Sequence, residues 1–414
     1  MVARGVFVMR GRMFWAAWML GALLVLSVGG DLAAARKVKL VIELPSGLPT
    51  GLPVPIPARI EGKAIPGAVL SVRHVAFGKE TVFAQCEVNG RVAWLVAAVR
   101  DGQAGQRELH LRGKVVGKAR EGRVVRFEDR KGGIECLDGD RKVMFYQRDP
   151  HSRDAGKHVA ANYFHPLYGL DGEVLTQDFP ADHPHHHGVF WAWHQLLVGT
   201  TRAGDPWVNK DFLPVVRKAE AVESGPVFAT LVTAVDWTSN LVTDADGRPR
   251  PIVSESGRFR VFHAVGETRH IDFRIRLSAL LRDVKIGGSE NVKGYSGFTV
   301  RVKPPMEMQI QDRRGRVEAD AVGSTSPWAD ISGRFGGRAI RSGVSILCDS
   351  RLPEFPPKWL LRFYGMQNVA YPGRLAVRLE QEHPLILRHR LVVHRGAGAR
   401  PSEQQRAFQS LTIR

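Results

Sequence analysis

The chain has 414 residues, of which 44% are hydrophobic, enough to bury a core and to exclude a wholly disordered protein. Its 43 glycines and 24 prolines favour a turn-rich β protein over a helical bundle. Three cysteines cannot form a disulfide framework, and no two of them have CxxC spacing. The formal net charge of +18 predicts attraction to anionic polymers or surfaces.

The first 35 residues have the pattern of a secretory signal peptide. Basic residues precede an uncharged stretch at 13–28, and alanines at 33–35 follow it. The alternative is an N-terminal membrane anchor, but the uncharged stretch is short for a bilayer, which needs about 20 residues. We therefore expect a periplasmic or secreted protein with no membrane span after cleavage of residues 1–35.

Residues 36–115 predict a small β-sandwich module. Hydrophobic residues alternate along 38–44, and further β-like runs follow at 69–75, 82–88 and 92–99. Turn signals such as Asn89-Gly90 separate these runs. A stretch rich in proline and glycine, residues 45–57, follows the first run.

Residues 116–414 predict a larger β domain. The clearest strand is 270–277, where apolar and polar residues alternate, and 385–394 is another long candidate. In the segment 298–302, alternate residues are apolar while Thr299 and Arg301 point away. No window of 12 or more residues is convincingly helical. The fold class is therefore all-β: a large antiparallel β-sandwich preceded by the small module.

A dense group of histidines is the main chemical signal. Residues 182–188 read DHPHHHG, within a 30-residue segment that holds six of the 15 histidines. Because Pro184 disfavours a helix, we expect a loop or an extended strand here. In an extended chain alternate side chains share a side, which places His183, His185 and His187 on one side and His186 on the other.

Four interpretations of this group stay open. The first is a divalent metal site with His183, His185 and His187 as ligands. Against it, tryptophans at 191 and 193 occupy the region where a cupin-type site has an acidic ligand. The second is a metal-free acid/base site whose imidazole is oriented by Asp182. The third is a pocket that only binds, and the fourth is a loop whose histidines form structural hydrogen bonds.

The histidine group lies within an ordered series of motifs that resembles a known family. Residues 162–172 (NYFHPLYGLDG) and 182–188 are similar to the Y-F-x-P-L-x-x-x-D-G and D-H-P-H-H-R-G motifs of mostly secreted bacterial proteins labelled methane oxygenase PmoA. Further similar segments follow in order, at 290–301, 328–333 (WADISG), 357–365 (PKWLLRFYG) and 385–396. The resemblance covers about residues 120–400 and excludes the N-terminal module.

The sequence departs from this family pattern at three places. His187 stands where the family has arginine, and Leu360 replaces a histidine. Residues 368–373 (NVAYPG) differ from the family's N-P-F-G. These departures predict an altered substrate or a reduced activity. A membrane subunit that oxidises methane needs spanning helices, so we do not expect methane oxidation. The motif order is more similar to a galactose-mutarotase-like supersandwich, in which a histidine and an acidic residue handle sugar protons.

The leading hypothesis is an exported protein that acts on a carbohydrate or glycoside. His185 or His186 would be the general acid/base, oriented by Asp182 and partnered by Glu290. Isomerisation, elimination and hydrolysis all stay open. The candidate substrate-binding residues are Tyr163, His165, Tyr168, Trp191, Trp193, Lys293, Arg301, Trp359 and Arg362.

Two hypotheses from other classes compete with it. One is a non-catalytic module that binds acidic polysaccharide through its positive charge and aromatic residues. The other is a metalloenzyme that uses the same histidines with a divalent metal. Nucleic-acid binding is not expected, because no recognisable module interleaves basic and stacking residues.

Overall fold

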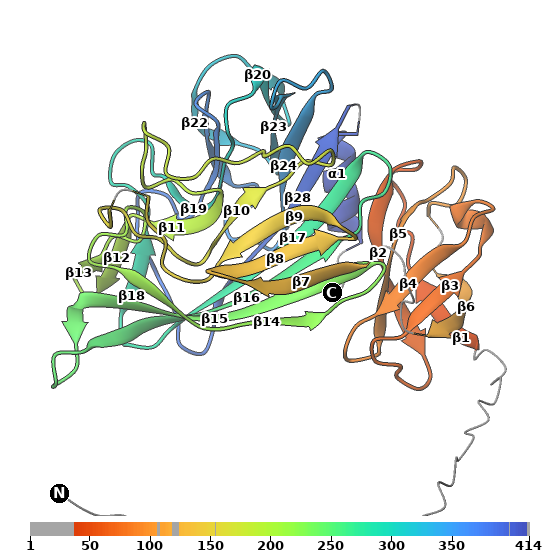
Figure 1. Ribbon diagram of the computed structural model, residues 1–414, viewed down its shortest axis with the longest axis horizontal. Coiled ribbons are helices and arrows are strands. Elements are labelled where there is room, and N and C mark those ends of the chain that lie inside the picture. The colour runs from red at the N-terminus through yellow and green to blue at the C-terminus, as the bar shows by residue number, and fades with distance from the viewer. Residues whose placement is uncertain (1–36, 106–107, 118–123, 154, 397, 412–414) are drawn as a thin grey trace, which may run out of the picture. The chain divides into compact units, whose positions relative to one another are not determined.

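The chain folds almost entirely into antiparallel β-strands, which confirms the all-β prediction (Figure 1). The computed structural model describes residues 37–105, 108–117, 124–153, 155–396 and 398–411. The predicted signal peptide at 1–35 lies outside these residues. Within them, no helix is long and apolar enough to cross a membrane.

The N-terminal module is a closed barrel, whereas a two-layered sandwich was predicted for residues 36–115. The strand order is β1-β2-β5-β4-β3-β6, and β6 pairs with β1 along residues 37–42 to close the sheet. Closure leaves no unpaired sheet edge. The elements are β1 (Lys37–Ile42), β2 (Pro53–Glu61), β3 (Val69–Val72), the 3₁₀ turn η1 (Val75–Phe77), β4 (Val82–Cys86), β5 (Val92–Ala98) and β6 (Leu109–Gly117).

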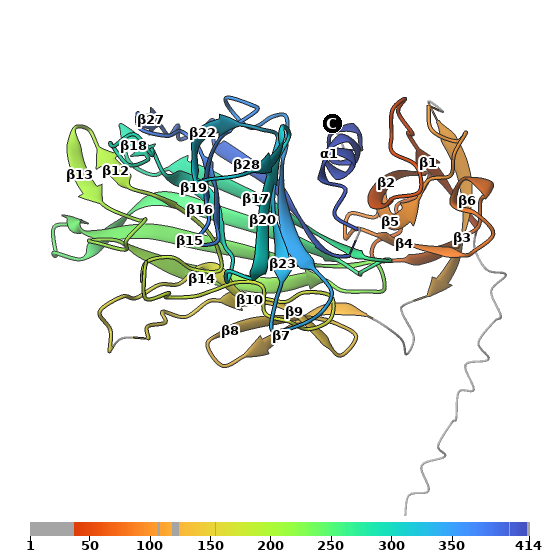
Figure 2. The ribbon, with the colours of Figure 1, turned by 90° about the horizontal axis from the view of Figure 1, so that it is seen from above.

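Two nine-stranded sheets form the layers of the sandwich that follows (Figures 1 and 2). Sheet I has the order β22-β25-β26-β19-β11-β10-β9-β8-β7. Its strands are β7 (Val125–Arg130), β8 (Gly133–Asp138), β9 (Arg141–Gln147), β10 (Tyr163–Leu167), β11 (Val189–Trp193), β19 (Ser296–Arg301), β22 (Ala321–Thr325), β25 (Lys358–Arg362) and β26 (Met366–Ala370).

Sheet II contains the longest strands and has the order β14-β15-β16-β17-β28-β24-β23-β20-β21. The predicted strands at 270–277 and 385–394 are β17 and β28, which pair with each other. The strands are β14 (Leu213–Glu223), β15 (Phe228–Thr243), β16 (Pro249–Phe262), β17 (Thr268–Ala279), β20 (Met306–Asp312), β21 (Gly315–Val317), β23 (Trp328–Arg334), β24 (Ser342–Cys348) and β28 (Leu385–Arg395).

A small four-stranded sheet and one helix complete the described elements. The small sheet has the order β13-β12-β18-β27, formed by β12 (Gln195–Val198), β13 (Thr201–Gly204), β18 (Val284–Gly287) and β27 (Val377–Arg378). The helix is α1 (Pro401–Ser410). Its Phe408 packs with sheet II, while Ala407 and Leu411 pack with the barrel core. The helix therefore fills the space between the barrel and sheet II.

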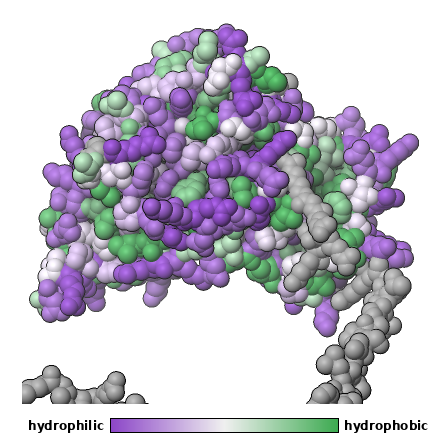
Figure 3. All heavy atoms as spheres, viewed as in Figure 1, coloured by the Kyte–Doolittle hydropathy of each residue, from purple (hydrophilic) through white to green (hydrophobic). Residues whose placement is uncertain are grey.

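Strand alternation determines which side chains form the core between the sheets. In β17 the odd-numbered residues from Ile271 to Leu277 are buried in this core, while Arg274 and Arg276 are exposed on the other face. All three cysteines are buried and free, at positions 86, 136 and 348. The face seen in Figure 3 is mostly hydrophilic, with hydrophobic side chains in small separate patches.

Candidate functional site

The histidine loop, residues 176–188, lies against the face of sheet I that points away from the core between the sheets. In β10, Phe164 packs in that core, whereas Tyr163 belongs to a second hydrophobic cluster on the opposite face. In β19, Val300 packs in the core, and Arg301 points to the opposite face and contacts the loop. The alternation predicted for residues 298–302 thus places Arg301 in the candidate site.

The three tryptophans predicted to bind substrate are not in this site. Trp191 and Trp193 share a face of β11 with Val189, and all three are buried in the core between the sheets. Trp359 is also in that core, and its indole N–H donates to the carbonyl oxygen of Ser326 at 2.7 Å. The prediction that these three tryptophans bind substrate is therefore wrong, because the alternation of β11 turns the rings of Trp191 and Trp193 inward and Trp359 is buried in the same core.

A turn, and not an extended strand, sets the geometry of the histidines. The backbone N–H of His186 donates to the carbonyl oxygen of His183 at 2.9 Å, with Pro184 at the second position of the turn, which that residue favours. The rings of His183 and His186 stack with a centroid distance of 4.6 Å and an interplanar angle of 7°. The expected division of the histidines between two sides is therefore wrong.

Asp182 joins the histidine loop to strand β19. Its Oδ2 atom accepts hydrogen bonds from His183 Nδ1 at 2.9 Å and from Arg301 Nη2 at 2.8 Å. Burial raises the pKa of Asp182, but the bonds from His183 and Arg301 outweigh burial and hold this pKa below its usual value. Asp182 therefore orients an imidazole, as predicted for this residue type, but the imidazole is that of His183.

Arg301 is a buried cation at the centre of this arrangement, with its side chain 2% exposed. Its guanidinium carbon lies 4.5 Å from the ring centroid of Tyr364, which also stacks on His183 at 4.5 Å. The Nε and Nη1 atoms of Arg301 have no hydrogen-bond partner among the described residues. The Nη2 atom also lies 3.5 Å from the amide oxygen of Gln177. The partners of the cation are thus one carboxylate, one amide oxygen and one aromatic face, and three of its N–H groups are left for another acceptor.

Burial separates the acid/base properties of neighbouring histidines. Burial, with smaller contributions from His183 and His187, lowers the pKa of His185 to about 4. Burial lowers the pKa of His186 much further, since that ring lies between His183 and Trp207. His185 is half-buried, so it is neutral at pH 7 and still reachable from solvent.

A second aspartate–histidine pair is the buried part of the same loop. His187 Nδ1 is 2.8 Å from Asp178 Oδ1, and the hydroxyl of Tyr163 donates to Asp178 Oδ2 at 3.0 Å. Burial raises the pKa of Asp178, but the bond from His187 outweighs it and the pKa is lowered. The Nε2 atom of His187 is buried without a partner among the described residues.

The cavity beside His187 is too small for a sugar. It measures about 30 Å³, roughly the share of liquid volume of one water molecule, and Glu255 lines it as well. Glu255 accepts hydrogen bonds from Asn162 and Trp237 at 2.8 Å each. We therefore assign His187 a supporting position at the buried side of the loop.

The remaining predicted residues divide between this site and other places. His165 faces the hydroxyl of Thr176 at 3.0 Å, and burial lowers the pKa of His165 to about 4. Arg362 pairs with Asp320 at 3.2 Å and lies 5.7 Å from the ring centroid of Tyr364. Tyr168 lines a separate hollow beside Lys142, away from the histidine loop.

Glu290 does not partner the predicted catalytic histidines. It pairs with Arg202 at 3.0 Å and lies 3.5 Å from His194 Nε2, in a neighbouring polar cluster that includes Asp205. Burial would raise the pKa of Glu290, but its own backbone hydrogen bond and the charge of Arg202 lower it. Lys293 is exposed on the turn that follows. The predicted partnership of Glu290 with His185 or His186 is therefore wrong.

The proposed metal ligands turn toward different partners. His183 faces Asp182, His187 faces Asp178, and the His183 and His185 rings are 5.8 Å apart. Within the part of the chain that the structure describes, no three His, Cys, Asp or Glu side chains are grouped to hold a metal ion.

Two residues of the site, Asp178 and Tyr364, were absent from the sequence predictions. Asp178 lies between the two matched motifs and has no distinctive neighbours. Tyr364 lies inside the segment 357–365, in which Trp359 and Arg362 were the residues predicted to bind substrate. The position of Tyr364 in this motif was a signal that could have identified it as a site residue. Tyr364 lies on the outer face of sheet I, whereas Trp359 lies in the core.

A family model covers residues 133–409 of the chain, and its description is a family of unknown function (DUF6807). These bounds agree with the range of about 120–400 expected from the motifs. No curated protein matches the chain.

Proposed function

The chain belongs to the DUF6807 family, and we propose that it is an exported enzyme that acts on a carbohydrate or glycoside by histidine-based acid/base chemistry. The observation that carries the proposal is the bridge made by Asp182, which binds His183 and Arg301 beside the neutral, solvent-reachable His185. The PmoA label of similar proteins enters this proposal only through the shared motifs, and methane oxidation is not part of it.

The two half-buried imidazoles, those of His183 and His185, have different environments. A carboxylate that accepts from Nδ1 orients an imidazole and stabilises the imidazolium that forms when the other nitrogen takes a proton. Asp182 occupies this position for His183. His185 has no such partner, and its lowered pKa leaves it neutral and ready to accept a proton or a hydrogen bond. One imidazole oriented by a carboxylate beside a second, neutral imidazole gives the site two groups that can take part in proton transfer.

The polar character of the site supports a hydroxylated substrate. Since the tryptophans are in the core, we propose recognition through hydrogen bonds, with Tyr364 as the aromatic residue at the site. Arg362 is half-buried next to that ring and contributes a cation at its edge.

The test is a turnover screen in which products are followed by proton NMR in D₂O. Neutral, methylated and uronate oligosaccharides are incubated with the protein. Signals of an epimerised sugar would indicate isomerisation. New olefinic protons would indicate elimination, and new reducing ends would indicate hydrolysis.

The decisive variants are His183→Gln and His185→Gln. Each should lower turnover at least about 100-fold, the lower end of the effect of a general acid or base, while the substrate still binds. His383→Gln, on an exposed turn, is the matched control and should keep full activity. Unchanged turnover in both loop variants would reject the proposed chemistry.

A further inference from the structure

The outer face of sheet II carries two adjacent rows of charged residues across strands β16, β17 and β28. In the first row Arg260 lies opposite Asp272, which lies opposite Arg390, so the charges alternate. Asp272 receives two hydrogen bonds from Arg390, at 2.5 and 2.8 Å. Arg260 pairs with Glu87 of the barrel at 2.7 Å. This first row is neutralised within the chain.

The second row is made only of arginines. Arg258 lies opposite Arg274, and Arg274 lies opposite Arg388. Arg258 pairs with Glu223 at 2.7 Å. Among the described residues, no carboxylate forms an ion pair with Arg274 or Arg388. Asp349 pairs with Arg351 at 2.6 Å and acts on Arg388 only through its charge. Like charges directly opposite one another on neighbouring strands are destabilising.

Partial burial of Arg258 and Arg388, on either side of the exposed Arg274, makes this repulsion stronger. Arg388 is half-buried. Burial and the charges of Arg351 and Arg274 lower its pKa, and this outweighs the opposite contribution of Asp349. Burial and the charge of Arg260 lower the pKa of Arg258 in the same way. Arginine keeps its proton at any pH at which proteins are folded, so the charge of the row persists.

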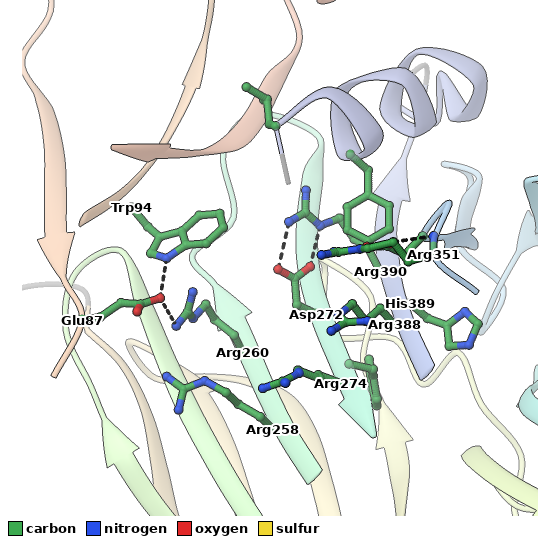
Figure 4. Close-up of a pocket in the computed structure, with 14 residues that line it drawn as sticks. Glu87, Trp94, Arg258, Arg260, Asp272, Arg274, Arg351, Arg388, His389 and Arg390 are labelled. Carbon is green, nitrogen blue, oxygen red and sulfur yellow. Dashed lines mark hydrogen bonds and ion pairs between the residues drawn. The ribbon is translucent and has the colours of Figure 1, made fainter. Parts of the chain in front are cut away.

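The arginine row forms the floor of a cavity of about 330 Å³ (Figure 4). In Figure 4 the side chains of Arg258, Arg274 and Arg388 gather on one side of the pocket, and no dashed line reaches Arg274 or Arg388. Trp94 of the barrel and Phe408 of α1 also line the cavity. The cavity is within the range of small-molecule sites.

We propose that this arginine groove, defined by Arg258, Arg274 and Arg388, binds an oxyanion ligand that carries a carboxylate or phosphate group between Arg274 and Arg388. Adjacent strands lie about 4.8 Å apart, so two neighbouring guanidinium groups can reach one oxyanion. Planar guanidinium groups bind carboxylate and phosphate with paired hydrogen bonds. The ligand supplies the negative charge that the second row lacks and the first row has in Asp272.

The groove is a different site from the histidine loop, which lies on the outer face of sheet I. Anion binding in the groove does not depend on the proposed enzymatic function, so an experiment can reject one of the two without the other.

The experiment is calorimetric titration of the protein, at low salt, with inorganic phosphate and with glucuronate. We expect at least one of the two to bind, with affinity that falls as sodium chloride is added. Arg274→Gln and Arg388→Gln should each weaken binding about tenfold or more, in line with loss of a charged hydrogen bond. Arg274→Lys keeps the charge and should recover part of the affinity.

Arg276→Gln is the matched control. Arg276 is exposed on the same strand and face, but it lies opposite Ser256 and Ile386 and does not line the cavity. The Arg276→Gln variant should bind phosphate or glucuronate with the affinity of the unchanged protein. Phosphate binding alone would assign a phosphate-bearing ligand, and glucuronate binding alone a carboxylate-bearing one. Binding of neither probe, or equal loss in Arg276→Gln, would overturn the proposal.

Discussion

The outer faces of the two large sheets differ in whether their clustered basic side chains can lose their charge. On sheet I, the histidine loop gathers imidazoles, and burial lowers the pKa of His185 and of His186, so both are neutral at pH 7. On sheet II, the row of Arg258, Arg274 and Arg388 cannot lose its protons. Histidine removes the cost of burial by releasing a proton, whereas arginine requires an anion.

This difference determines what each region needs from outside the chain. Asp182 and Asp178 supply carboxylates to the histidine loop, and its rings stack on one another and on Tyr364. In the arginine groove, Arg274 and Arg388 have no ion-paired carboxylate among the described residues, and Asp349 acts on Arg388 only through its charge. We therefore expect the loop to keep its structure without a ligand, and the groove to gain stability when an anion binds.

The largest expected effect is on the carboxylate that supports the histidine loop. Asp178→Ala leaves His187 Nδ1 and the hydroxyl of Tyr163 buried without a partner. Each unsatisfied group costs about 1–3 kcal/mol, so the free energy of unfolding should fall by about 2–5 kcal/mol, measured by urea denaturation. Asp246→Ala, at an exposed turn, is the control and should be neutral. An unchanged free energy of unfolding in Asp178→Ala would show that the loop does not depend on its internal carboxylates.

The fold was largely predictable because alternation reports directly which face of a strand is buried. It identified β17 and the orientation of Arg301, but it does not report whether a sheet closes, so the barrel was taken for a sandwich. Strand β2 was missed because Pro53, Pro55 and Pro57 indicate a loop. In the barrel, β1 pairs with β2 only at residues 59–61, so the missing N–H groups of these prolines lie outside that ladder.

The site was less predictable, because its contacts join distant residues. Asp182 and His183 are adjacent in sequence, whereas Arg301 reaches them only through the pairing of β19 with β11. The orientation of Trp191 and Trp193 could not be inferred from periodicity, because all residues of β11 are buried on both faces. Such a strand gives no alternation that distinguishes core from site.

The next expected effect is the response of the two regions to pH. Burial is the largest cause of the lowered pKa of His185. The neighbouring His183, His187 and His158 lower this pKa further, and Asp205 raises it. The pKa of His185 is about 4 in the folded protein and 6.5 ordinarily. Between these values the unfolded chain binds a proton that the folded chain does not, so stability falls as pH decreases from 6.5 to about 4.

Removal of His185 should therefore reduce this slope. In His185→Gln the loss of stability per pH unit should be smaller by less than about 1.4 kcal/mol, since the ring is partly solvated. Denaturant titrations between pH 7 and 4 measure it. Arg274→Gln should leave the slope unchanged, because arginine stays charged in both states. If the pH dependence of stability changed equally in His185→Gln and Arg274→Gln, the proposed difference between the histidine loop and the arginine groove would be wrong.

The smallest effect is the stability of the arginine row without a ligand. Replacing both Arg274 and Arg388 with glutamine removes two like-charge contacts across strands, so the protein should become more stable by up to about 1 kcal/mol at low salt. Added salt screens partly exposed charges, so this gain should shrink as sodium chloride rises from 10 mM to 1 M, roughly a change of the screening length from 30 to 3 Å. Arg276 has no cationic neighbour directly across the strands, so Arg276→Gln should show neither the gain in stability nor its salt dependence.

With a bound anion the order of stability reverses. The anion stabilises the unchanged protein and not the double variant, because only the unchanged protein still carries the charges that the anion neutralises. A double variant that is less stable than the unchanged protein at every salt concentration would mean that the packing of the arginine stems outweighs their repulsion, and the groove would then need no anion.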